Sequence, residues 1–291
     1  MTDIVILTPN PDDPSFAGQW PQVRDRLVSA LATGGLAARS EAWTDHIDRA
    51  DGLASADLVM PLVAWGYHRD HARWMRACAT WQAVAVRMLN PPSVLGWNSD
   101  KSYLERLGAA GIPIPRTIWS AQITPEEVAA AFDAFGTDEL VVKPRVSGGG
   151  WQTTRLARGE ALSEAPDGPG LIQPFITALE TEGELSLLFF GGRFSHAVRK
   201  RPRDGEFRIQ QQFGGLYAPE PEPDPVAVAL AGRVLATVEE ELLYARIDLA
   251  RGAGGQWLLM EAELIEPDFY LNHAPNGGEA FVAAVAGRLN R

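Results

Sequence analysis

Two glutamates near the C-terminus are spaced so that their side chains point the same way. Glu261 and Glu263 lie in an apolar stretch that is typical of a β-strand, and residues i and i+2 of a strand project to the same face. Two carboxylates on one face repel each other unless a cation lies between them, and oxygen-only ligands suit Mg²⁺ shared with phosphate groups. A solvated strand face is the commoner explanation of such a pair, but the apolar flanks weaken it here.

A third carboxylate stands in the apolar stretch that precedes the glutamates. Asp248 lies within residues 245–250, which a Gly-rich connection separates from residues 256–264, and the two stretches are predicted to form a hairpin. Asp248 would then supply a further oxygen ligand. Because the loop length is ambiguous, the spacing leaves open whether Asp248 and Glu261 share a face.

A lysine and a glycine-rich loop follow one another in the middle of the chain. Lys143 lies inside the apolar run 139–146, where a charged side chain is costly unless it meets an anion. Residues 147–150 (Ser-Gly-Gly-Gly) come next, and successive backbone N–H groups in such a loop can surround phosphate oxygens. From this segment alone, a lysine at a sheet edge explains Lys143 about equally well, and a flexible turn is the commoner explanation of the glycines.

Two well-known nucleotide-binding motifs are missing from the sequence. It contains neither the P-loop pattern G-x-x-x-x-G-K-[ST] nor a G-x-G-x-x-G fingerprint that opens a helix. The missing fingerprint argues against a dinucleotide-dependent oxidoreductase.

A cationic stretch from Arg199 to Arg203 is followed by Arg208 in a glycine-containing segment. Such a run is most often solvated surface. Gly205 and the pair 214–215 surround Arg208, however, as expected of a loop that folds over a charged ligand. Guanidinium groups commonly hold phosphoryl groups and carboxylates.

No side chain is arranged as an activated nucleophile. Cys78 is at helical spacing from two tryptophans and is interpreted as a core residue, and no serine stands in a G-x-S-x-G motif. Because Cys78 is the sole cysteine, an internal disulfide and a multi-cysteine zinc site are excluded. His68 and His71 are interpreted as ordinary helix residues, and the alternative is that they face a substrate cleft.

The elements that must position these residues fall into three blocks. In the first, predicted strands at 4–7, 56–65 and 83–89 alternate with predicted helices at 20–33 and 68–81, which favours a parallel sheet.

The second block begins near Asn90. Asn98 or Ser99 is predicted to cap a helix that runs through Ala110, and Thr124 is predicted to cap a second helix that ends at Gly136. The strand 139–146 follows.

The third block begins near residue 171. A hairpin is predicted around Gly191-Gly192, a helix from Asp224-Pro225 to about Leu243, the second hairpin described above, and a closing helix over 276–289.

Composition restricts the partners of the chain. Its 291 residues are 46% hydrophobic and 22% charged, with a formal net charge of −11, which disfavours nonspecific binding to nucleic acid or anionic membranes. No uncharged apolar run reaches the roughly 18 residues of a membrane span. The N-terminus has no basic region followed by an apolar stretch, so we expect no signal peptide and a cytoplasmic protein.

Taken in order, these features resemble the ATP-grasp superfamily, in the branch that contains glutathione synthetase, D-alanine–D-alanine ligase and the ribosomal-protein glutamate ligase. The resemblance covers about Asn90 to Pro267, and the order of the segments is its specific feature. TEGELSLLFFGGRFSHAVRK and EAELIEP further resemble a bacterial subgroup that includes the cycloserine-forming cyclo-ligase. The segments are NSDKSYLERLGAAGIPIPRT (98–117), ELVVKPRVSGGG (139–150), LIQPFI (171–176), TEGELSLLFFGGRFSHAVRK (181–200), GEFRIQQQFGG (205–215), ARIDL (245–249) and LLMEAELIEP (258–267).

The resemblance implies an α/β fold in which ATP is held between two α+β subdomains, with an N-terminal parallel-sheet domain before them in the chain. It implies residues 1–95 for the N-terminal domain, 96–172 for the central subdomain and 173–291 for the C-terminal subdomain.

The resemblance also implies a role for each matching residue. Those that bind ATP are two phosphate-binding lysines, two loop glycines, a hinge beside adenine and a ribose-binding carboxylate: Lys101, Lys143, Gly148, Gly149, Gln173, Phe175, Ile176 and Glu184. Arg208 matches the arginine that contacts the phosphate or acylphosphate and, with Lys101 and Lys143, is expected to be catalytic. Magnesium, with two ions expected, is held by Asp248, Glu261 and Glu263.

Two positions depart from the family pattern. The last magnesium ligand is usually asparagine, whereas this sequence has Glu263. The extra charge either tightens magnesium binding or means that the position is not a ligand. The glycine-rich loop runs into Trp151 and Gln152 instead of small residues, which puts its closure geometry in doubt.

The activity implied by the resemblance is an ATP- and Mg²⁺-dependent ligation. A small-molecule carboxylate forms an acylphosphate, and an amine then displaces phosphate. An intramolecular cyclo-ligase of the cycloserine-forming type and a non-catalytic nucleotide-binding protein are the alternatives. The expected partners are therefore small-molecule carboxylate and amine substrates, with no nucleic acid and no membrane, and a homodimer is one possible assembly.

Overall fold

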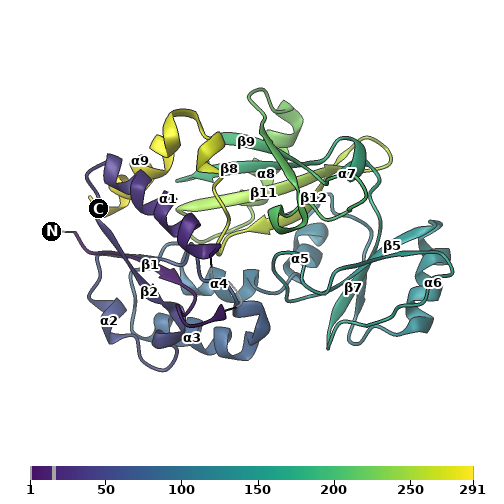
Figure 1. The fold of residues 1–291 in the computed structure, drawn as a ribbon, viewed down its shortest axis with the longest axis horizontal. Helices are drawn as coiled ribbons and strands as arrows, with labels where there is room; N and C mark the ends of the chain where they lie inside the picture. Colours follow the sequence, from purple (N-terminus) through teal and green to yellow (C-terminus); the bar gives the residue numbers. More distant parts are fainter. Residues whose placement is uncertain (1, 15–17, 291) are drawn as a thin grey trace.

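A computed structural model describes residues 2–14 and 18–290 of the chain (Figure 1). The first sheet has three parallel strands, with β1 (Ile4–Thr8) between β2 (Ala38–Ala42) and β3 (Leu58–Met60). All five residues of β1 are buried, because helices cover both faces. Ile4 and Ile6 pack in the cluster that contains Leu31 of α1 (Trp20–Thr33), while the alternate residues of β1 face α3 (His71–Ala83). The predicted parallel sheet is confirmed.

Of the strands predicted in this block, one is wrong in part and another is wrong altogether. The run 56–65 is a strand only over Leu58–Met60, after which the chain turns. The run 83–89 is no strand: Ala83 ends α3, and Ala85 reverses the chain with a φ of +52°. Only an isolated bridge between Met88 and Val59 joins this segment to the sheet. The short helix α2 (Asp51–Ala54) precedes β3.

The second sheet has four antiparallel strands in the order β4-β7-β5-β6: β4 (Ile118–Ser120), β5 (Glu139–Pro144), β6 (Thr154–Ala157) and β7 (Gly170–Pro174). Helix α6 (Pro125–Phe135) packs on one face of this sheet. The predicted capping box is confirmed, with Glu127 N–H donating to Thr124 Oγ1 at 3.2 Å, and Gly136 ends the helix at a φ of +66°.

The helix predicted over 98–110 is wrong in its first turn. The structure has α4 (Pro92–Asn98), a turn, and then α5 (Tyr103–Ala109). Asn98 caps nothing, because its amide donates to Ala262 O at 2.8 Å and accepts from Leu264 N–H at 2.9 Å. The turn after Asn98 is therefore tied to the C-terminal sheet.

The third sheet has five antiparallel strands in the order β10-β9-β8-β11-β12: β8 (Glu184–Phe190), β9 (Arg193–Arg201), β10 (Leu216–Pro219), β11 (Tyr244–Arg251) and β12 (Trp257–Glu263). Both predicted hairpins, β8–β9 and β11–β12, are confirmed. The helix predicted to reach about Leu243 ends at Leu235. Leu243 lies outside it, just before β11, and its N–H donates to Asn90 Oδ1 at 2.8 Å. The helices of this part are α7 (Ala178–Thr181), α8 (Pro225–Leu235) and the closing helix α9 (Glu279–Leu289).

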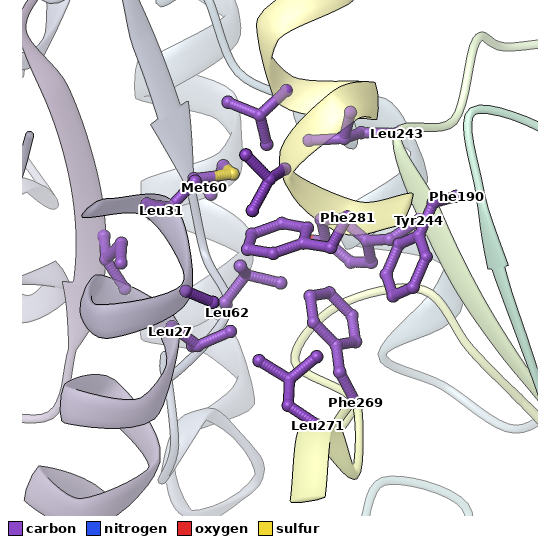
Figure 2. Packing of buried hydrophobic residues seen from close by; sticks show 14 of the residues in the cluster. Leu27, Leu31, Met60, Leu62, Phe190, Leu243, Tyr244, Phe269, Leu271 and Phe281 are labelled. Atoms are coloured by element: carbon purple, nitrogen blue, oxygen red, sulfur yellow. The ribbon is translucent and has the colours of Figure 1, made fainter. Parts of the chain in front are cut away.

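One face of the five-stranded sheet changes character along its strands. Leu188, Phe190 and Tyr244 are apolar and pack with Phe281 of α9 in the core shared with the N-terminal sheet (Figure 2). Because side chains alternate along a strand, the residues that continue this face are 184 and 186 of β8 and 246 and 248 of β11. These residues are polar or charged, so one sheet face supplies both an interdomain core and a polar wall.

The structure combines these three sheets with helices and so confirms the α/β class. The predicted boundaries at 95/96 and 172/173 stay predictions. Among the helices that the structure describes, none is long and apolar enough to cross a membrane.

Candidate active site

A cavity of about 810 Å³ lies between the N-terminal block, the four-stranded sheet and the five-stranded sheet. Binding sites of small molecules and cofactors are usually single concave pockets of about this size. The residues predicted from the sequence to bind ligands all line it: Lys101, Lys143, Gly148, Gly149, Gln173, Phe175, Ile176, Glu184, Arg208, Asp248, Glu261 and Glu263. The fold therefore brings together residues that span much of the chain.

The register of β11 and β12 decides the question that the sequence left open. Asp248 lies directly opposite Glu261, so their side chains share a face. Arg246 lies opposite Glu263 on the same face. The register shifts after Asp248, which is why counting back from the turn does not give this pairing.

Each of these carboxylates contacts a cation. Glu261 lies 3.0 Å from Lys101 Nζ, and Glu263 forms an ion pair with Arg246. Asp248 accepts from Lys200 Nζ at 3.1 Å and from Arg246 Nη2 at 3.0 Å, and Ser186 Oγ donates to it at 2.6 Å.

The charges around these carboxylates set their pKa values in opposite directions. Burial alone raises the pKa of Asp248, but Arg246 and Lys200 together hold it below its ordinary value. Burial likewise opposes ionisation of Glu261, yet Lys101 and Lys143 lower its pKa. For Glu263, burial and the neighbouring acids outweigh Arg246 and raise the pKa well above its ordinary value.

The donor set suits a hard cation, although no metal centre is ready-made. Carboxylate oxygens of Asp248, Glu261 and Glu263 are what Mg²⁺ prefers. Within residues 2–14 and 18–290, no three His, Cys, Asp or Glu side chains gather as a metal cluster. Arg246 and the lysines lie beside the carboxylates instead, so a bound Mg²⁺ would share these anions with the protein's own cations.

The lysines of this sequence are Lys101, Lys143 and Lys200, and all of them line the cavity. Lys101 Nζ donates to Ser147 O at 3.1 Å, which joins Glu261 to the start of the glycine-rich loop. The side-chain ammonium group of Lys143, on β5, makes no hydrogen bond or ion pair among the described residues. Burial, with repulsion from Lys101, lowers its pKa to about 8. An unpaired cation in a cavity is a binding group for an anion.

The hinge predicted from the sequence lies where β7 leads into α7. Gln173 Nε2 donates to Thr117 Oγ1 at 2.9 Å, and the Phe175 ring lies 3.7 Å from the guanidinium carbon of Arg155. Glu184 also lines the cavity, but its carboxylate already lies 2.6 Å from Lys200 Nζ.

Two loops meet over the cavity. Gln212 Nε2 donates to Gly149 O at 3.0 Å, and a Cβ at Gly148 would lie 3.0 Å from His68 Nδ1. The Trp151 ring lies 5.5 Å from the His68 ring. The unusual continuation of the loop into Trp151 thus gives it a partner in the N-terminal block.

The two histidines lie in different surroundings. His68 is in a short 3₁₀ turn before α3 and lines the cavity, and burial lowers its pKa to about 4. His71 begins α3 and bonds Ser99 Oγ at 2.8 Å, outside the cavity lining. The reading of His68 as a helix residue is therefore corrected, and its position toward the cleft is found.

Arg208 lies in the loop over the cavity, as the glycines around it indicated. Its guanidinium forms an ion pair with Glu206 at 2.8 Å, and its Cζ atom lies 3.6 Å from the centre of the Phe213 ring.

Sequence reasoning missed several charged residues of the cavity. Arg246 precedes Asp248 by two residues, so the alternation of side chains along a strand indicates that both point to the same face. Lys200 was seen only as part of a cationic run, although counting back from the Gly191-Gly192 turn brings it near Glu184, its paired residue. Glu266 and Tyr270 follow β12 in an irregular segment, where no periodicity identifies them.

Comparison with known proteins agrees with this geometry. Residues 4–90 match the family model for the N-terminal domain of D-cycloserine synthetase DcsG. The cycloserine biosynthesis protein DcsG of Streptomyces lavendulae is 29% identical over 290 residues, which covers 90% of this chain and 92% of that protein. The crystal structure of D-cycloserine synthetase DcsG superposes with a TM-score of 0.79 at 26% identity, covering 99% of both chains. The ATP-grasp ligase PsnB, complexed with a precursor variant, Mg and ADP, has a TM-score of 0.68 at 16% identity, also covering 99% of both chains.

Proposed function

We propose that the cavity of this chain activates a small-molecule carboxylate as an acylphosphate. The chain belongs to the ATP-grasp superfamily and is an ATP-dependent carboxylate–amine ligase. The observation that carries this proposal is the convergence of basic and acidic side chains on one cavity. They are the three lysines, Arg208, Arg246, Asp248, Glu261 and Glu263. Phosphoryl transfer needs positioning and charge neutralisation more than a protein nucleophile. Buried Cys78 lies outside this cavity.

The proposed roles of the residues follow their places in the cavity. Lys101 and Lys143 bind the phosphates of ATP together with the N–H groups of Gly148 and Gly149. Gln173, Phe175 and Ile176 contact adenine, and Glu184, next to Lys200, contacts the ribose. Arg208 reaches the transferring phosphoryl group from the loop above. Unpaired Lys143 supports the first of these assignments most directly.

The proposed magnesium ligands are Asp248, Glu261 and Glu263, with room for two ions as the working hypothesis. Magnesium bound there supplies neutralisation of the phosphate charge. The chain's own part is to hold these carboxylates ionised, which Lys101, Lys143, Lys200 and Arg246 do for Asp248 and Glu261.

The proposed reaction takes place in two steps. A carboxylate oxygen attacks the γ-phosphorus of ATP, the bond to the β-phosphate oxygen breaks, and ADP leaves. The amine nitrogen then attacks the carbonyl carbon, the bond from that carbon to the phosphate oxygen breaks, and the nitrogen loses a proton.

A cyclo-ligase, in which the nucleophilic nitrogen belongs to the activated molecule, is the second candidate function. The similarity to DcsG over 90% of this chain favours it. In both cases the proposed partners are small molecules, the proposed location is the cytoplasm, and a homodimer is one proposed assembly.

Hydroxylamine offers a test that does not require the natural amine. Incubation of the chain with MgATP, hydroxylamine and a panel of carboxylates should give ADP and a hydroxamate in equal amounts with the true substrate class. ATP turnover with one carboxylate and no added amine, giving a ring product, would select the cyclo-ligase. ATP binding with no hydroxamate from any carboxylate would leave only a nucleotide-binding protein.

A further inference from the structure

Glu266 is a cavity carboxylate that has no partner of its own. It follows β12 and lines the cavity between buried Ile265 and buried Pro267. Tyr244 Oη donates to Ile265 O at 2.7 Å, which fixes the backbone on one side of it. Among the residues that the structure describes, Glu266 forms no hydrogen bond or ion pair.

The other carboxylates of the cavity differ from Glu266 in this respect. Each is within ion-pair distance of a basic side chain: Glu184 and Asp248 of Lys200, Glu261 of Lys101, Glu263 of Arg246, and Asp268 of Arg26. Lys143 is the corresponding exception among the lysines. The cavity thus presents an unpaired ammonium group at Lys143 and an unpaired carboxyl group at Glu266.

The charges that face Glu266 do not compensate for its burial. Burial raises the pKa of Glu266 to about 8; Arg246 and Lys101 act against this rise, and Glu261 adds to it. Arg246 is already engaged by Asp248 and Glu263, and Lys101 by Glu261. A half-buried carboxylate in this situation gains from a cationic ligand.

We propose that Glu266 binds a positively charged nitrogen of the carboxylate substrate and so selects substrates that carry an ammonium group. This inference rests on the proposed function. Phosphate groups of ATP are anions and cannot be its partner. The substrate carboxylate must approach the γ-phosphate. Glu266 can therefore bind only a second, cationic group of the same molecule.

The test uses matched pairs of acids that differ only in charge at one position. Alanine is compared with lactate and serine with glycerate, in both enantiomers, in the MgATP and hydroxylamine assay. The variants are Glu266→Gln, which removes the charge, and Glu266→Asp, which keeps it. Glu222→Gln is the control, because Glu222 is exposed in a loop away from the cavity.

We expect the wild type to prefer the ammonium-bearing member of a pair. Glu266→Gln should raise KM for that member about tenfold or more, leave kcat within a few fold, and leave the hydroxy acid unchanged. Glu266→Asp should recover part of the preference, and Glu222→Gln should match the wild type. An equal loss for both members of a pair overturns the inference, and so does a raised magnesium requirement in Glu266→Gln, which would mean a metal ligand.

Failure of the proposed function gives a different result. If the wild type binds MgATP but yields no hydroxamate with any acid, the ligase proposal fails on its own. Calorimetric titration of the same acids in the presence of MgADP then decides on Glu266. Binding of ammonium-bearing acids that is lost in Glu266→Gln supports the inference, whereas equal binding by both proteins, or no binding of such acids, overturns it.

Discussion

Arg246 and Glu263 lie directly opposite each other on β11 and β12, and their side chains form an ion pair. Arg246 also contacts Asp248 at 3.0 Å, so one guanidinium joins two of the proposed magnesium ligands. Glu263 stands where the resembled family has asparagine, and Arg246 offsets the charge that this adds. The two residues would therefore help to set the negative charge at the proposed magnesium site.

Replacing Glu263 with asparagine tests this balance. Glu263→Asn should keep the enzyme active and raise the magnesium concentration for half-maximal ADP release several-fold, because one anionic ligand is lost while Arg246 stays beside Asp248. Magnesium titrations of ADP release check this, with Glu222→Gln as control. Complete loss of activity in a folded protein would assign Glu263 another task, such as holding the acceptor amine.

Lys143→Ala should weaken MgATP binding on the order of tenfold or more, because it removes the unpaired cation of the cavity. Calorimetric titration measures the affinity. Lys143→Arg keeps the charge and should lose less, and Arg49→Ala, at an 87% exposed side chain, serves as control. Unchanged affinity in a folded Lys143→Ala protein would contradict the phosphate-binding role.

The pH dependence of ATP binding follows from the same lysine. Its pKa is lowered to about 8 by burial, and bound phosphates raise it again, so only the cationic form binds well. Affinity should therefore be steady below about pH 7 and fall as the pH rises through 8, by up to about tenfold per pH unit. Titrations near pH 8.5 in buffers of different ionisation enthalpy should show proton uptake in the wild type and none in Lys143→Ala. A constant affinity from pH 7 to 9 would count against this coupling.

Most of the fold was predictable because its signals are local. The Thr124 capping box and the Gly191-Gly192 turn specify their own geometry, and both are confirmed. The run 83–89 was misread because apolar β-branched residues favour strands, whereas Ala85 turns the chain and buried Val86 serves the core beside α3. Local preference cannot report such a tertiary contact.

The predicted ligand-binding residues line one cavity as expected, but their pairings and several further cavity residues were not predictable. Strand alternation gave the shared face of Glu261 and Glu263, but the register shift next to Asp248 hid its partner. Glu266 lies in irregular backbone, and its lack of a cation is a property of the folded cavity alone. The roles of all these residues stay predictions.

Lys200 contributes to stability as well as to the cavity wall. Its ammonium group lies between Glu184 at 2.6 Å and Asp248 at 3.1 Å, and all three side chains are at most 10% exposed. Lys200→Met should leave buried carboxylates without this cation and lower the free energy of unfolding by about 3–5 kcal/mol. Urea unfolding followed by circular dichroism measures the change, with Arg201→Met at the exposed end of the same strand as control. A loss below about 1 kcal/mol would mean that Arg246 and the surroundings suffice.

The central claim is that the carboxylate is activated on the γ-phosphate of ATP, and the fate of its oxygen tests this most directly. With the true substrate labelled with ¹⁸O in its carboxylate, one labelled oxygen should appear in inorganic phosphate, and ADP should form in equal amount. The attacking oxygen becomes the bridge of the acylphosphate and leaves with phosphate when the amine attacks. Label in AMP, with release of pyrophosphate, would contradict both the acylphosphate and the phosphate-binding roles given to Lys101, Lys143 and Arg208.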